Sequence, residues 1–205
     1  MNITVFENGP FLVNTYLVVN DGKKGFIIDP GSELHSLFDK VEQEDIELHA
    51  IVNTHGHIDH VAGVNTVKKK YNIPFYMNEL DLPLLDSLQV QARMFGVPDP
   101  GYITIDNALP NSGEITIAGM EIKVLYTPGH SKGSVSLLIE NAIFTGDVLF
   151  NFSIGRTDLP GGNYGELIRS VKEKIFVLPH ETIVLPGHGP QTTVEREKRY
   201  NPFFN

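Results

Sequence analysis

Residues 54–60, Thr-His-Gly-His-Ile-Asp-His, place three of the chain's eight histidines and one carboxylate within six residues. His55 and His57 are two residues apart, so on an extended segment both imidazoles leave the same side of the backbone. Asp59 and His60 are adjacent and point apart, and at the start of a helix they can face a neighbouring position. Imidazole and carboxylate are both ligands of divalent metals. This loop therefore predicts a metal site that serves two ions.

Three further candidate ligands lie downstream, each where a predicted strand ends in a loop that contains glycine. They are His130 after Thr-Pro-Gly, Asp147 after Thr-Gly, and His188 after Pro-Gly. Small residues let the backbone approach a buried ion, and strand ends are where α/β scaffolds place chemistry. The histidines without such a context are interpreted as surface or core residues: His35, His49 and His180.

The bulk composition limits the classes of function. With 205 residues and 41% hydrophobic content, the chain can bury a sizeable core, and one α/β domain over residues 1–205 is expected. A net charge of −9 disfavours nucleic acid as a partner. The absence of cysteine excludes disulfides, thiolate ligands and a cysteine nucleophile. No signal peptide or membrane-spanning apolar run is visible, so a cytoplasmic protein without a membrane partner is expected; the oligomeric state is not predicted.

The hydrophobic pattern predicts the elements that position these residues. Strands are predicted at residues 3–6, 11–19, 25–29, 73–77, 114–117, 121–126, 134–140, 142–145 and 182–185. Helices are predicted after Ser32, from about residue 60 to 71, over 79–95 and over 164–176. Strands followed by helices in both halves predict a layered α/β fold, with each half delivering ligands from one edge.

Local signals add detail to this outline. Ser32, Asn78 and Asn163 are candidate N-caps of three helices. Residues 96–110 are rich in loop-forming residues, and such a segment is either a wall or lid of a site or a plain surface connection. The run of lysines at 68–70 is interpreted as the solvated face of a helix.

The order of these motifs resembles the metallo-β-lactamase superfamily over nearly the whole chain. The resemblance implies an α/β (α+β) fold, a four-layer αββα sandwich of two mixed β-sheets flanked by helices, with metals in a cleft at one edge. It implies two divalent metal ions, with zinc as the first choice and iron or manganese as alternatives. In the family's pattern one ion is held by His55, His57 and His130, the other by Asp59, His60 and His188, and Asp147 bridges both.

Details of the sequence indicate which branch of the superfamily the chain resembles. His57 stands where the flavin-linked oxygen-reducing branch carries Glu, and Asp147 is a bridging residue that zinc β-lactamases generally lack. Both of these branches are therefore disfavoured. The segment 145–162 is similar to that of short, single-domain relatives of glyoxalase II. This similarity implies a binuclear hydrolase of small acyl thioesters, with hydroxyacylglutathione as the reference substrate.

Other functions in the superfamily remain as alternatives. Persulfide dioxygenases are also similar in the Gly-Arg-Thr-Asp run, and they bind one iron through the equivalents of His55, His130 and Asp147. A lactonase or another ester hydrolase is a third alternative. The acidic balance disfavours a nuclease. A purely structural metal site is disfavoured because it needs only four closed ligands.

The ligand set itself indicates hydrolytic chemistry. Two adjacent divalent ions lower the pKa of a bound water to about 7, so hydroxide is available at neutral pH. Water is then the nucleophile, and a substrate carbonyl over the second ion is polarised during attack. Asp59 and Asp147 act first as ligands, with proton acceptance as a secondary catalytic role.

Two residues are candidates for substrate binding. Arg156 follows Asp147 closely, and its guanidinium can hold a carboxylate such as the glycyl end of glutathione. The alternative is a structural salt bridge to Asp158 or Glu166. Tyr164 is the second candidate, with burial of its ring at the start of a helix as the alternative.

Overall fold

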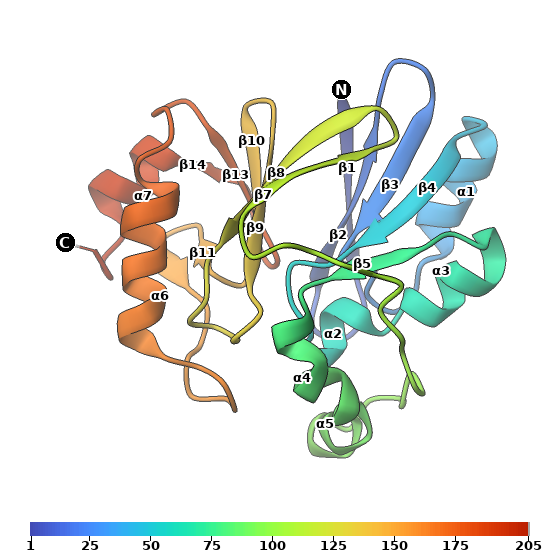
Figure 1. Ribbon diagram of the computed structural model, residues 1–205, viewed down its shortest axis with the longest axis horizontal. Coiled ribbons are helices and arrows are strands. Elements are labelled where there is room, and N and C mark those ends of the chain that lie inside the picture. The colour runs from blue at the N-terminus through green and yellow to red at the C-terminus, as the bar shows by residue number, and fades with distance from the viewer. Residues whose placement is uncertain (205) are drawn as a thin grey trace.

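Two six-stranded sheets face each other in the computed structural model, which describes residues 1–204 (Figure 1). The first sheet has the order β1 (Asn2–Asn8), β2 (Val13–Val19), β3 (Lys24–Ile28), β4 (Glu47–Val52), β5 (Phe75–Met77), β6 (Asn107–Ala108). The second has the order β14 (Thr192–Thr193), β13 (Ile183–Pro186), β10 (Ala142–Gly146), β9 (Val135–Ile139), β8 (Met120–Tyr126), β7 (Gly113–Ile117). Both sheets contain parallel and antiparallel pairs, so both are mixed as predicted.

Helices cover the outer faces of both sheets. In Figure 1, α1 (His35–Gln43) and α3 (Val64–Tyr71) lie outside the first sheet, and α6 (Tyr164–Ser170) and α7 (Val194–Tyr200) lie outside the second. A π-helical turn over Val171–Ile175 continues α6, and the short strands β11 (Leu149–Phe150) and β12 (Ser153–Ile154) form a small hairpin. The predicted four-layer αββα sandwich is confirmed. No helix within residues 1–204 is long and apolar enough to cross a membrane.

Three apolar clusters fill the spaces between the four layers. Successive side chains of a strand point to opposite faces, and β2 shows the consequence. Tyr16 and Val18 belong to the cluster between the sheets, whereas Leu17 belongs to the cluster under α1 and α3. The third cluster joins Ile143 of β10 to Leu167 of α6. Each sheet is therefore buried on both faces, which fixes its register against the neighbouring layers.

The predicted helix over residues 79–95 is divided into three pieces. A 3₁₀ turn at Glu79–Asp81 leads into α4 (Leu82–Asp86), and α5 (Leu88–Phe95) follows. The division between α4 and α5 falls at Ser87, whose hydroxyl donates to Leu84 O at 3.0 Å. A serine that bonds the preceding turn competes with the helical backbone and bends it. The pieces lie beside α2 (Ile58–Val61), at the lower edge of the sandwich in Figure 1.

The cap predictions have mixed outcomes. Asn78 accepts from Leu80 N and Asn163 accepts from Glu166 N, so both predicted N-caps are confirmed. The Ser32 cap is wrong: α1 begins at His35 and has no side-chain cap. Glu33 has a φ of 64°, and a residue in the left-handed region cannot belong to a right-handed helix.

One edge of the sandwich gathers the strand ends that matter for the site. The parallel pairs β3–β4 and β10–β13 both end there. Hydrogen bonds join the two sheets at this edge: Val135 N donates to Thr54 O at 2.9 Å, and Asn14 N donates to Gly187 O at 2.7 Å. The loops that follow these strands are therefore held against one another.

Candidate metal centre

The structure brings together all the predicted metal ligands at this edge. They come from the loop after β4 (His55, His57), from α2 (Asp59, His60), from the β8–β9 loop (His130), and from the ends of β10 (Asp147) and β13 (His188). The helix predicted from about residue 60 to 71 is divided in two: α2 begins at Ile58 and carries Asp59 and His60, and α3 follows from Val64. One short loop thus contributes to two ligand groups.

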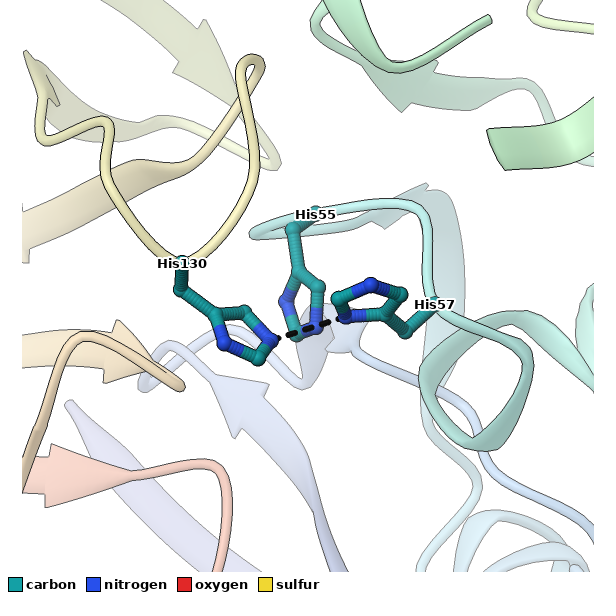
Figure 2. Close-up of side chains that lie close together, drawn as sticks. All are labelled: His55, His57 and His130. Carbon is teal, nitrogen blue, oxygen red and sulfur yellow. Dashed lines mark hydrogen bonds between the residues drawn. The ribbon is translucent and has the colours of Figure 1, made fainter. Parts of the chain in front are cut away.

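The first group consists of three imidazoles and is called the nitrogen group: His55, His57 and His130. Their rings approach a common point in Figure 2, and one nitrogen of each lies within 4.8 Å of the others. His57 Nδ1 is 2.8 Å from His130 Nε2. Burial and the neighbouring histidines lower the pKa of His55 well below its ordinary value and that of His57 to about 3. Both rings are therefore neutral at pH 7, as metal ligands must be.

The second group mixes nitrogen and oxygen and is called the mixed group: Asp59, His60 and His188. His188 Nε2 lies 3.2 Å from Asp59 Oδ2 and 3.3 Å from His60 Nε2. Burial alone lowers the pKa of His60, but the carboxylates of Asp147, Asp59 and Asp29 outweigh it and raise this pKa. The pKa of His188 is raised for the same reason.

Asp147 lies between the two groups. Its Oδ2 is 3.6 Å from His130 Nε2 and 3.6 Å from His188 Nε2, and its Oδ1 is 3.3 Å from His60 Nε2. Burial raises the pKa of this carboxyl, but the adjacent histidines hold it well below its ordinary value. Asp147 is therefore an ionised carboxylate that touches both groups.

Hydrogen bonds at the far side of four rings fix their tautomers. Carbonyl and carboxylate oxygens only accept, so His130 Nδ1 donates to Arg156 O at 2.8 Å and His188 Nδ1 donates to Phe11 O at 3.0 Å. His60 Nδ1 donates to Asp29 Oδ2 at 3.0 Å. Thr54 Oγ1 donates to the same carboxylate at 2.7 Å, which leaves its oxygen to accept from His55 Nδ1 at 3.1 Å. In each of these rings Nδ1 carries a proton and Nε2 faces the centre.

The donor set fits divalent metal ions. His55 Nε2 and Asp147 Oδ1 are buried without a hydrogen-bond partner among residues 1–204. Buried polar atoms are nearly always paired, so two unpaired acceptors at the meeting point of the ligand groups indicate that cations complete the site. Nitrogen and carboxylate oxygen without sulfur suit zinc, iron or manganese.

Asp29 is a functional residue that the sequence analysis missed. It follows β3, is buried, and accepts from Thr54 N, Thr54 Oγ1 and His60 Nδ1. It therefore orients His60 directly and His55 through Thr54. The sequence carried a signal, because Asp29-Pro30-Gly31 stands at a strand end next to small residues, as His130, Asp147 and His188 do.

Asp81 is a second missed residue. It is buried and accepts from Gly56 N at 3.0 Å, from Ser131 Oγ at 2.7 Å and from Gly133 N at 2.6 Å. These bonds tie the loop of His55 and His57 to the loop of His130. Nothing in its sequence context indicated this role, since an acidic residue in the first turn of a helix is ordinarily exposed.

Of the two predicted substrate contacts, Arg156 lines the cavity over the metal ligands and Tyr164 does not. Arg156 lines a cavity of about 210 Å³ over the metal ligands, yet its guanidinium also makes two 2.7 Å bonds to the carboxylate of Asp158. The alternative salt bridge is thus present. Tyr164 is not among the described residues that line this cavity, and its side chain is 53% exposed. The alternative, burial of its ring at the start of α6, is therefore wrong, and its contact with substrate stays a prediction.

Fold and site together define a metal-dependent enzyme built on a four-layer αββα sandwich. The family model described as "Metallo-beta-lactamase superfamily" matches residues 8–188. The chain belongs to the metallo-β-lactamase superfamily.

A curated relative and three solved structures are similar over nearly the whole chain. Hydroxyacylglutathione hydrolase GloC of Haemophilus influenzae is 38% identical and covers 100% of this chain and 99% of its own. BLEG-1, a B3 metallo-β-lactamase, is 39% identical with a TM-score of 0.94 and 99% coverage of both chains. TTHA1623 in a di-iron-bound form is 37% identical with a TM-score of 0.89, covering 98% of this chain and 99% of its own. ETHE1 from Myxococcus xanthus is 26% identical with a TM-score of 0.82, and the match covers 98% of this chain and 84% of the ETHE1 chain.

Proposed function

We propose that this protein is a binuclear metal-dependent hydrolase of small acyl thioesters, of the glyoxalase II kind. The observation that carries the proposal is the pair of ligand groups with the ionised Asp147 between them. The similarity to hydroxyacylglutathione hydrolase GloC supports a glutathione thioester as the reference substrate. Zinc is the first choice of metal, and the di-iron form of TTHA1623 supports iron as an alternative.

Two divalent ions, if bound at these groups, would supply hydroxide at neutral pH and polarise the substrate carbonyl. His55, His57 and His130 would hold one ion, and Asp59, His60 and His188 the other, with Asp147 shared. The chain's own contribution is orientation: backbone carbonyls and Asp29 fix the ring tautomers before substrate arrives. As the carbon–sulfur bond breaks, Asp59 or Asp147 would accept the proton that remains on the attacking oxygen and pass it to the departing sulfur, so that the products are a carboxylate and a thiol.

The test is hydrolysis of S-lactoylglutathione by protein loaded with zinc, manganese or iron, with bound metal measured in the same samples. We expect turnover in the wild type and a loss on the order of 10³-fold in Asp147→Ala, because the carboxylate that both groups share is removed. Asp39→Ala, at an exposed position on α1, is the matched control and keeps full activity. A wild type that carries two ions per chain and leaves the thioester intact contradicts the proposal.

A persulfide dioxygenase is the second candidate, and the similarity to ETHE1 favours keeping it. It requires one iron, held by His55, His130 and Asp147, and it consumes oxygen. Oxygen uptake with glutathione persulfide by a protein that holds a single iron supports this candidate. The similarity to BLEG-1 adds a β-lactam to the substrates to be compared, and lactones complete the set.

A further inference from the structure

We infer that the groove beside the metal centre binds an apolar acyl chain, so that the preferred thioesters carry an extended hydrocarbon acyl group. The inference rests on the proposed function and names the substrate class of the same site. The groove has a volume of about 370 Å³ and lies between the segment of α4 and α5 and the loop at residues 159–161.

Exposed apolar side chains gather in this groove. Leu80, Val90 and Met94 are 44%, 64% and 69% exposed, and all three line it. Val90 and Met94 are four residues apart on α5 and therefore share one face of that helix. Exposed apolar side chains that line one hollow mark a binding surface, whereas scattered ones carry no such meaning.

The groove is continuous with the metal centre. His57, Phe95 and Leu159 line both the groove and the 210 Å³ cavity over the ligands. A substrate whose carbonyl lies beside His57 can therefore extend one substituent along α5 without leaving the protein surface. The acyl group starts at the carbonyl carbon, so it is a substituent within reach of this groove.

The wall of the groove is tied in place. Gln91 Oε1 accepts from Ile58 N at 3.0 Å, and Gln91 Nε2 donates to Leu84 O at 2.8 Å and to Ser87 Oγ at 3.1 Å. These bonds join α5 to α4 and to the metal loop. A groove that exists before the ligand arrives costs little ordering entropy, which favours binding of a flexible chain.

The groove offers few charged groups to a ligand, which suits a hydrocarbon chain. Among the described residues that line it, Asp81 and Lys132 carry full charges. Asp81 is buried and accepts three hydrogen bonds from the neighbouring loops, so its carboxylate is not free to receive a cationic substrate. Lys132 can lay its aliphatic stem along an apolar chain while its ammonium stays in water.

The test uses S-alkyl thioethers of N-acetylcysteamine, which cannot be hydrolysed, titrated by calorimetry into the zinc-loaded protein. We expect the Kd to fall about fourfold for each added methylene from ethyl upwards, until the groove is filled. The double variant Val90→Thr, Met94→Gln should flatten this dependence on chain length. Val177→Thr, an equally exposed valine that does not line the groove, is the matched control and keeps the wild-type dependence.

Each outcome decides the inference. A Kd independent of chain length, or one that the double variant leaves unaltered, overturns it. A change of oligomeric state in the double variant on size-exclusion chromatography overturns it too, because the apolar face then serves a second copy of the chain. Hydrolysis of an acetyl thioester without any chain-length dependence upholds the proposed function and removes the acyl groove. Chain-length-dependent binding without hydrolysis of any thioester upholds the apolar groove and contradicts the proposed function.

Discussion

The nitrogen group and the mixed group are adjacent, share Asp147, and yet are electrostatically opposite. In the nitrogen group, burial among other imidazoles lowers the pKa of His55 and His57. In the mixed group, the carboxylates raise the pKa of His60 and His188. His55 and His57 are therefore neutral before any metal binds, whereas His60 and His188 must release protons when a metal binds.

The nitrogen group and the mixed group also differ in how exposed their side chains are and in which ligand atoms they offer. The rings of the nitrogen group are buried, while His188 and Asp59 of the mixed group are partly exposed. An all-imidazole set suits zinc, and added carboxylate widens the choice towards harder ions such as manganese. We therefore expect the nitrogen group to hold its ion tightly and the mixed group to hold a more exchangeable one.

The largest expected effect comes from removing one histidine of each group. His57→Ala should lose the tightly held ion and nearly all activity, because the ring is buried among the other ligands. His188→Ala should keep one ion per chain and lose the exchangeable one. Metal content after dialysis against a chelator measures both, with His180→Ala, an exposed histidine, as the control. Equal losses in the two variants would remove the distinction between the groups.

Asp29→Asn is expected to weaken both groups together. The carboxylate accepts from His60 directly and from His55 through Thr54, so neutralising it disturbs a ligand in each group. Loss of an outer hydrogen-bond partner lowers metal affinity by about 10-fold to 100-fold. Competition with a chromophoric chelator measures the two affinities, and a change confined to one of them contradicts this role.

The lowered pKa of His57 predicts acid sensitivity of the metal-free protein. Its pKa is about 3 when folded and 6.5 when unfolded, so between these values the unfolded state binds more protons and stability falls as pH falls. Between pH 7 and pH 5 this one ring accounts for about 2 kcal/mol of the loss. In urea unfolding, the His57→Asn variant should lose about 2 kcal/mol less unfolding free energy than the wild type between pH 7 and pH 5. The His180→Asn variant should lose as much as the wild type. Equal acid sensitivity in all three proteins is the contrary result.

The smallest expected effect concerns Arg156, which lies outside both groups. Its side chain is 53% exposed and pairs with Asp158, and surface pairs contribute little to stability. We expect Arg156→Gln to raise the KM for S-lactoylglutathione a few-fold with kcat unchanged. Asp158→Asn releases the guanidinium and should lower the KM. A KM unaltered in both variants would leave the pair a purely structural one.

Much of the site could be predicted from the sequence because its signals are local. Two histidines at a spacing of two, and single ligands that follow Gly at strand ends, identify the same residues that the structure gathers. The caps at Asn78 and Asn163 were equally local, since an N-cap bonds within its own first turn. The order of the motifs along the chain was enough to indicate the family and hence the sandwich.

The features that could not be predicted from the sequence depend on tertiary contacts. Asp81 acts through bonds to residues 25, 50 and 52 positions away, and no local pattern contains such partners. The break at Ser87 went unseen because apolar spacing continues across it. The opposite pKa shifts of the two groups also arise only in the folded chain, because burial and the distances between distant side chains set them. The sequence by itself indicated which residues are candidate metal ligands, and the fold decided how differently the two halves of the site are charged.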